Sequence, residues 1–127
     1  MIKGIGTDIL SIKRFKTLYK TWGYRFLNKL FNEEEIPEYK SNKKLVESLA
    51  GKFAAKEAIS KANGTGIGKD LSFKDIKILK GKKGEPVAKI SKLELKKKIH
   101  ISISHSDEFA VAFAIMENKW TILYLAK

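Results

Sequence analysis

The sequence predicts an α+β fold, because strand patterns stand near both ends of the chain and helical patterns fill the middle. The clearest strand is Ile99–His105, where apolar and polar residues alternate strictly. The clearest helix runs to about Ala62 and ends at a glycine. The 127 residues suit one domain, 1–127, and the 43% of apolar residues suffice for a packed core.

The first strand is predicted over Ile2 to Leu10, where Gly4 and Gly6 permit close backbone approach beside Asp8. A helix follows from Lys13 to about Leu30, with Gly23 as a candidate break. On a helical wheel its apolar residues share one side, which we expect to face the core, and its basic residues lie nearly opposite. The apolar set is Phe15, Leu18, Tyr19 and Trp22, and the basic set is Lys13, Lys16 and Lys20, with Arg14 on the flank.

A short helix is expected over Glu33 to Tyr39, limited by Pro37. The long central helix follows, capped by Ser41 or Asn42 and ended by Asn63-Gly64. The glycine-rich loop 64–68 comes next, and its backbone N–H groups could serve an anion, although a plain connector explains it equally well.

The C-terminal third is predicted to be mostly strands joined by turns. The segment 92–98 is expected to be a short basic helix or loop. The expected strands are 74–80, 85–90, 99–105, 109–116 and 120–125.

The chain carries a net charge of +12, from 26 basic and 14 acidic residues, so it should attract polyanions. A charged stripe is usually a solvated outer face, but no acidic residue occurs between Ile9 and Asn32, which strengthens the case for a binding role here. The longest uncharged apolar stretch has eight residues, too few to span a bilayer, and no signal region is evident at the N-terminus. With no cysteine present, a cytoplasmic location is expected.

Two acidic residues in separate elements are the candidates for chemistry. Glu57 follows Leu45, Leu49 and Phe53 along one helical stripe, so its carboxylate needs a partner, either Lys61 four residues on or a metal ion. Asp8 supplies a second carboxylate at the end of the first strand. Two oxygen ligands suit Mg²⁺, which completes its shell with water and substrate phosphates.

Together, Gly6-Thr7-Asp8 and the segment Phe53–Lys61 (FAAKEAISK) resemble the paired signature of the 4'-phosphopantetheinyl transferase superfamily. Gly4–Ile9, the 49–68 stretch and Ile101–His105 extend the likeness, in order, across almost the whole chain. The resemblance implies an antiparallel sheet packed against a long central helix. Leu10 stands where longer, single-chain relatives carry a third acid, so the chain is similar to the short trimeric group.

The resemblance also implies a reaction: transfer of 4'-phosphopantetheine from coenzyme A to a serine of apo acyl carrier protein, with release of adenosine 3',5'-bisphosphate, in fatty acid biosynthesis. Asp8 and Glu57 would hold Mg²⁺, with Mn²⁺ as an alternative, and Asp8, Glu57 and Lys61 would be catalytic. Glu57, directly or through a water, would take the serine proton. Lys52 stands where the family usually has arginine. Lysine keeps the positive charge but cannot bind a phosphate through two parallel N–H groups, so the contact is weaker. The implied coenzyme A contacts are Lys52, Lys56, Lys61, Gly64, Thr65, Gly66, Ser104 and His105.

The implied partners are an acidic apo acyl carrier protein and two further copies of the chain. The carrier would dock on the basic face, through Lys13, Arg14, Lys20 and Arg25. The implied assembly is a homotrimer with active sites at subunit boundaries, and neither nucleic acid nor membrane is an expected partner. Two alternatives stay open: a non-catalytic basic module that binds nucleic acid, and a trimer that only binds carriers.

Overall fold

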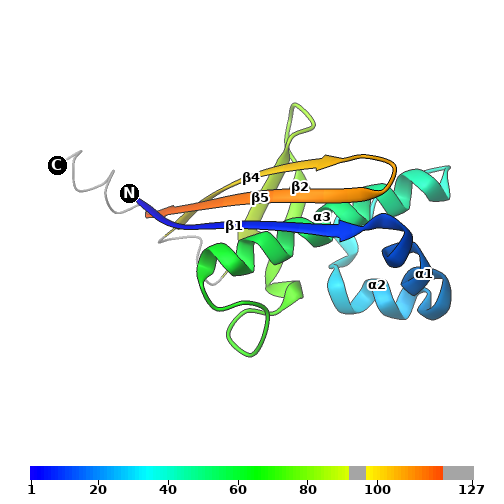
Figure 1. The fold of residues 1–127 in the computed structure, drawn as a ribbon, viewed down its shortest axis with the longest axis horizontal. Coiled ribbons are helices and arrows are strands. Elements are labelled where there is room, and N and C mark those ends of the chain that lie inside the picture. Colours follow the sequence, from blue (N-terminus) through cyan, green and yellow to red (C-terminus); the bar gives the residue numbers. More distant parts are fainter. Residues whose placement is uncertain (92–96, 119–127) are drawn as a thin grey trace.

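A computed structural model describes residues 1–91 and 97–118 of the chain. Its main layer is a three-stranded antiparallel sheet in the order β1 (Ile2–Ser11), β5 (Phe109–Asn118) and β4 (Lys97–His105). The long helix α3 (Asn42–Asn63) lies along one face of this sheet (Figure 1). The predicted α+β class is therefore confirmed, including the antiparallel sheet packed against a long helix.

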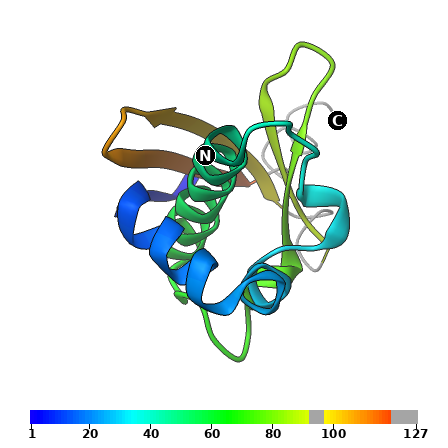
Figure 2. The ribbon, with the colours of Figure 1, turned by 90° about the vertical axis from the view of Figure 1, so that its right-hand side faces the viewer.

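A hairpin of β2 (Ile76–Lys80) and β3 (Pro86–Ile90) forms a separate two-stranded sheet, preceded by the 3₁₀ turn η2 (Phe73–Asp75). Figure 2 looks roughly along α3 and shows the three-stranded sheet on one side of the helix and the hairpin on the other. Buried residues of α3 pack against both, so the helix is the centre of the core. The α3 members of this core cluster are Ala54, Ala55, Ala58, Ile59 and Ala62.

The predicted helix over 13–30 is two helices, α1 (Ile12–Trp22) and α2 (Tyr24–Leu30). The chain turns between them at Gly23, which ends α1. Its φ is 61°, a value that glycine adopts without strain. The candidate break is confirmed. The next expected helix, Glu33 to Tyr39, is wrong in length: only the 3₁₀ turn η1 (Glu33–Glu35) forms, because the Glu35 carboxylate folds back to accept the Asn32 N–H at 2.7 Å.

The apolar side of α1 is only partly a core face, which corrects the helical-wheel expectation. Phe15 is buried and meets the ring of Phe53 on α3, with the two centroids 6.0 Å apart. Leu18 and Trp22, farther along, are 38% and 59% exposed. Leu18 instead faces a cavity of the candidate site, described below.

The long helix begins and ends as predicted. The Ser41 hydroxyl, rather than Asn42, accepts the Lys44 N–H, and Gly64 ends the helix with a φ of 85°. Lys97 and Lys98 belong to β4, which corrects the expectation of a basic helix or loop at these two residues. The remainder of that segment, 92–96, and the predicted strand 120–125 lie outside the described residues. Among the helices of the described ranges, no segment is both long and apolar enough to cross a bilayer.

Candidate active site

The first strand carries Asp8 directly over the last turns of α3. Gly4, Gly6 and Asp8 share the face of β1 that points toward the helix. A Cβ on Gly4 would lie 1.8 Å from the Ala62 carbonyl oxygen, and one on Gly6 would lie 1.8 Å from the Ala58 carbonyl oxygen. Only glycine allows this approach, which brings the Asp8 carboxylate to the end of the helix.

This close approach predicts that Gly6→Ala destabilises the fold. The backbone of β1 or α3 must shift to admit the methyl group, and we expect a loss of about 3 kcal/mol or more in the free energy of unfolding. Urea denaturation monitored by circular dichroism measures it. Gly68→Ala is the matched control, because a Cβ there meets nothing within 4 Å. Equal stability of the two variants would contradict the packing described here.

Lys61 pairs with Asp8, not with Glu57. Its Nζ lies 3.0 Å from Asp8 Oδ1 and also donates to the Thr7 carbonyl oxygen at 2.9 Å. Of the two partners expected for Glu57, Lys61 forms its ion pair with Asp8 instead, because β1 brings a second acid to the same end of the helix. The Lys61 side chain is 53% exposed, so it remains able to reach a ligand.

Glu57 lies beside this pair with its carboxylate half-buried. Burial raises the pKa of Glu57, the negative charge of Asp8 raises it further, and Lys61 partly opposes both effects. The two acids, 49 positions apart in the chain, are thus close enough to repel each other. Repelling carboxylates at one cavity wall are a suitable oxygen donor set for a divalent cation.

The three charged residues line one cavity of about 590 Å³. The rest of the wall comes from the end of β1, from α1 and from α3, and includes Arg14, Phe15, Leu18 and Phe53. Among residues 1–91 and 97–118 no group of three or more acidic, histidine or cysteine side chains could hold a metal. A cation at Asp8 and Glu57 would therefore take the rest of its shell from water and from a bound phosphate.

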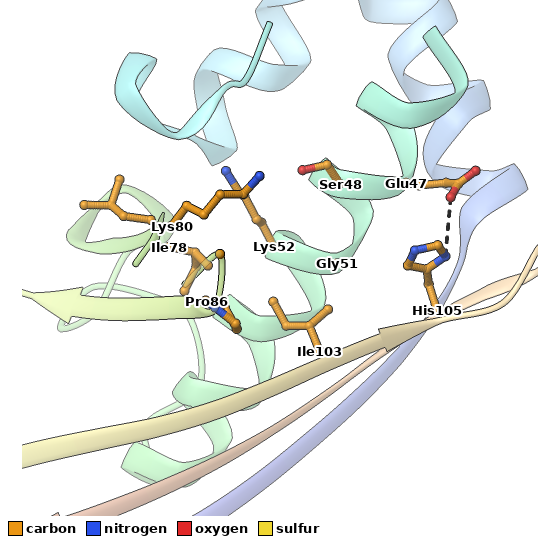
Figure 3. Close-up of a pocket in the computed structure, with 11 residues that line it drawn as sticks. Glu47, Ser48, Gly51, Lys52, Ile78, Lys80, Pro86, Ile103 and His105 are labelled. Atoms are coloured by element: carbon orange, nitrogen blue, oxygen red, sulfur yellow. Dashed lines mark ion pairs between the residues drawn. The ribbon is translucent and has the colours of Figure 1, made fainter. Parts of the chain in front are cut away.

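A second cavity, of about 180 Å³, lies between α3, the β2–β3 hairpin and the end of β4 (Figure 3). Lys52, Lys80 and His105 bring positive or titratable nitrogens to it, while Ile78 and Pro86 supply apolar wall. This combination suits a flat apolar ring with phosphate attached. No described residue lines both cavities.

Two side chains of this second cavity are held by neighbours. Lys52 Nζ donates to the Glu35 carbonyl oxygen at 2.5 Å. Burial lowers the pKa of Lys52, with Glu35 opposing the shift and Lys80 adding to it. His105 Nδ1 lies 3.4 Å from Glu47 Oε2 on α3, as Figure 3 shows. Ser104, one residue earlier on β4, is exposed and lines neither cavity.

Lys56 lies in the interior, contrary to the coenzyme A contact expected of it. It is fully buried, and its ammonium donates to the Leu30 carbonyl, the Phe73 carbonyl and the Glu35 carboxylate. With three acceptors and no exposed surface, it has no donor left for a ligand. The adjacent residue of the motif, Glu57, faces the cavity because one helical step rotates a side chain by about 100°.

The glycine-rich loop after α3 has fewer free N–H groups than expected. The N–H groups of Gly64, Gly66 and Gly68 donate to the carbonyl oxygens of Lys61, Ser60 and Leu71. The Thr65 hydroxyl donates to the Gly66 carbonyl at 3.0 Å. An anion at this loop would therefore compete with bonds inside the chain.

The predicted docking residues lie on the exposed faces of α1 and α2, and Arg14 also borders the Asp8 cavity. Sequence reasoning missed the apolar part of this surface. Leu18, Trp22 and Phe26 line a groove of about 250 Å³ with Arg25 and Lys29. The missed signal is the length of α1, whose apolar stripe extends past the residues that α3 can cover.

The α+β fold combines two carboxylates and a lysine at one cavity with a second, basic and partly apolar cavity, an arrangement suited to an enzyme that acts on a phosphorylated ligand. A family model described as "4'-phosphopantetheinyl transferase superfamily" matches residues 4–114, and the chain belongs to this superfamily. The resemblance stated from the sequence is thus confirmed.

Named relatives and solved structures agree with the family. The chain is 43% identical over 124 residues to a holo-(acyl-carrier-protein) synthase of Halothermothrix orenii, covering 92% of this chain and 98% of that one. It is similar to the Bacillus anthracis holo-(acyl-carrier-protein) synthase in complex with CoA (3',5'-ADP), with a TM-score of 0.83, 41% identity and coverage of 92% and 97%. It is also similar to the Helicobacter pylori holo-(acyl-carrier-protein) synthase in complex with coenzyme A, with a TM-score of 0.81, 40% identity and coverage of 89% and 99%.

Proposed function

We propose that the chain transfers 4'-phosphopantetheine from coenzyme A to a serine of an acidic apo acyl carrier protein, releasing adenosine 3',5'-bisphosphate, in cytoplasmic fatty acid biosynthesis. The observation that carries the proposal is the meeting of Asp8, Glu57 and Lys61 at one cavity wall. The named relatives, which span nearly the whole chain, support the same reaction.

Asp8 and Glu57 are the residues that would hold Mg²⁺. A bound divalent ion neutralises charge on a pyrophosphate and orients it for attack. Lys61 shares its ammonium with Asp8 and can turn to a phosphate oxygen, where it stabilises charge that develops on the leaving group. Glu57 takes the proton of the attacking serine, directly or through a water.

The second cavity is the place we assign to the adenosine end of coenzyme A. Lys52, Lys80 and His105 offer charge to its phosphates, and Pro86 and Ile103 offer apolar surface to the ring. No described residue lines both cavities, and we propose that one coenzyme A reaches both at a boundary between two copies of the chain.

The outer face of the three-stranded sheet supports such an assembly, which we propose is a homotrimer. It carries a group of exposed apolar side chains on β1 and β5, and such a patch is typical of a contact between protein chains. With their exposed fractions they are Ile5 (59%), Ile9 (62%), Phe109 (43%), Val111 (37%) and Phe113 (42%).

The direct test mixes the purified chain with Mg²⁺, coenzyme A and apo acyl carrier protein, and weighs the carrier by mass spectrometry. The expected result is a mass gain of one phosphopantetheine arm, absent with a chelator and absent for a carrier whose acceptor serine is alanine. An unchanged carrier mass under the complete conditions would overturn the proposed function.

The basic face should act on the carrier and not on coenzyme A. Arg25→Glu, at a docking residue that lines neither cavity, is expected to raise the carrier KM about tenfold or more, because a charge reversal turns steering attraction into repulsion. The KM for coenzyme A should change much less. Steady-state kinetics with each substrate varied in turn measures both, and Lys89→Glu, an exposed reversal on the hairpin, is the control for net charge. Equal changes of the two KM values would contradict a docking role for Arg25.

A further inference from the structure

A buried ion pair with several further hydrogen bonds lies outside both cavities. Lys56 Nζ and Glu35 Oε2 form an ion pair at 2.9 Å, and both side chains are completely buried. The ammonium also donates to the carbonyl oxygens of Leu30, the last residue of α2, at 2.7 Å and Phe73 of η2 at 2.9 Å. It lies 5.0 Å from the centroid of the Phe31 ring. Lys56 thus joins three segments to the helix that carries Glu57.

Glu35 extends these bonds to the wall of the second cavity. Its Oε1 accepts the Ile78 N–H of β2 at 2.8 Å, and its Oε2 accepts the N–H and side-chain amide of Asn32 at 2.7 and 2.9 Å. Its carbonyl oxygen holds the Lys52 ammonium at 2.5 Å. One residue therefore places both a backbone segment and a cationic side chain of the cavity.

Stability alone is a poor explanation for this pair. A buried ion pair is commonly no more stabilising than apolar side chains of the same volume. Two buried charges where apolar side chains would serve equally well indicate that the pair fixes the geometry of its neighbours.

The β2–β3 hairpin packs on α3 through Ile76, Ile78 and Ile90, and the Glu35 carboxylate adds a directional bond to its backbone. The β2–β3 sheet is separate from the β1-β5-β4 sheet, so no sheet hydrogen bonds between described strands tie it to the rest of the fold. The α1–α2 arm is held by edge-to-face ring contacts that the ion pair does not touch, Phe15 with Phe26 at 5.2 Å and Phe15 with Phe53 at 6.0 Å. Loss of the ion pair should therefore loosen the cavity wall before it loosens the arm.

We propose that Glu35 and Lys56 are positioning residues that hold the β2 wall and Lys52 against α3 and so set the affinity for the adenosine end of coenzyme A. The identity of the ligand rests on the proposed function. The Lys56 of the family signature then acts through the cavity wall rather than by touching the ligand.

The experiment measures binding of adenosine 3',5'-bisphosphate by isothermal titration calorimetry, together with both KM values. Glu35→Gln, nearly isosteric but uncharged, is expected to raise the Kd about tenfold and the carrier KM less than threefold. A general loss of stability would not raise the nucleotide Kd more than the carrier KM. Met116→Ala is the control for stability: this fully buried residue pairs with Gly4 and Ile99 and lines neither cavity. Its Kd should stay within twofold of wild type.

A milder variant covers the case in which Glu35→Gln does not fold. Asn32→Ala removes the side-chain amide bonds to Glu35 and to the Lys74 carbonyl oxygen but leaves the ion pair, and should raise the Kd about threefold. Variants that bind the nucleotide as tightly as wild type would overturn the positioning role, as would equal rises in Kd and carrier KM. Failure of the wild-type protein itself to bind the nucleotide would overturn the proposed function instead.

Discussion

Glu57→Gln is expected to lower kcat for phosphopantetheine transfer at least about 100-fold while the chain stays folded. A glutamine amide cannot accept the serine proton, and a positioned general base contributes on the order of 10²–10⁴ in rate. The amide also weakens any cation site shared with Asp8. Single-turnover transfer, measured by carrier mass against time, tests the loss.

The same variant should gain stability in the absence of metal. The pKa of Glu57 is raised in the folded state, mainly by burial and then by Asp8, so its ionised form costs the native state free energy. The cost is absent below the ordinary glutamate pKa, where both states are protonated. It grows as pH rises toward the raised value and is complete above it. The melting temperature of Glu57→Gln should therefore exceed that of wild type near neutrality and match it in acid.

A neutral control separates these effects from a change in net charge. Glu38→Gln removes an exposed acid that lines neither cavity, and should leave both rate and melting temperature unchanged. Undiminished turnover by Glu57→Gln would remove Glu57 from the mechanism. A melting temperature that fell near neutrality would contradict the burial and repulsion described for this carboxylate.

Phe113→Glu should convert the proposed trimer into monomers and abolish most of the activity. Phe113 lies in the exposed apolar patch of the sheet, directly opposite Thr7 of β1, and a carboxylate buried there without a partner is costly. The side chain points away from the core, so the monomer should fold. Light scattering should give the mass of one chain instead of three, and kcat/KM should fall at least about tenfold.

Mixing two inactive variants tests whether the site is shared. Asp8→Asn damages one cavity and His105→Ala damages the other. Subunits of the two kinds, mixed and allowed to exchange, should recover part of the wild-type activity only if one active site uses both chains. A fully active Phe113→Glu monomer would place the whole site within one chain, and a monomeric wild type would overturn the trimer.

Local sequence patterns predicted the elements of this fold well. Strict alternation located β4, and glycines at 23 and 64 located two helix ends, because these features act over a few neighbouring residues. The weak prediction was the helix over 33–39, where a single side-chain bond from Glu35 to Asn32 closed one turn and no periodic pattern continued it. The family signature placed Asp8 and Glu57 as the acids to examine, and both line the same cavity.

By itself the sequence determined the α+β class, the order of the elements and the pair of acids, since each depends on residue type and short-range spacing. Tertiary structure alone decided that Lys61 pairs with Asp8, that Lys56 is buried against Glu35, and that Leu18 and Trp22 stay outside the core. The reason is that these outcomes join residues 21 to 53 positions apart, or depend on where a neighbouring element stops. Helical spacing offers a lysine several possible partners, and only the approach of β1 or η1 to α3 selects one.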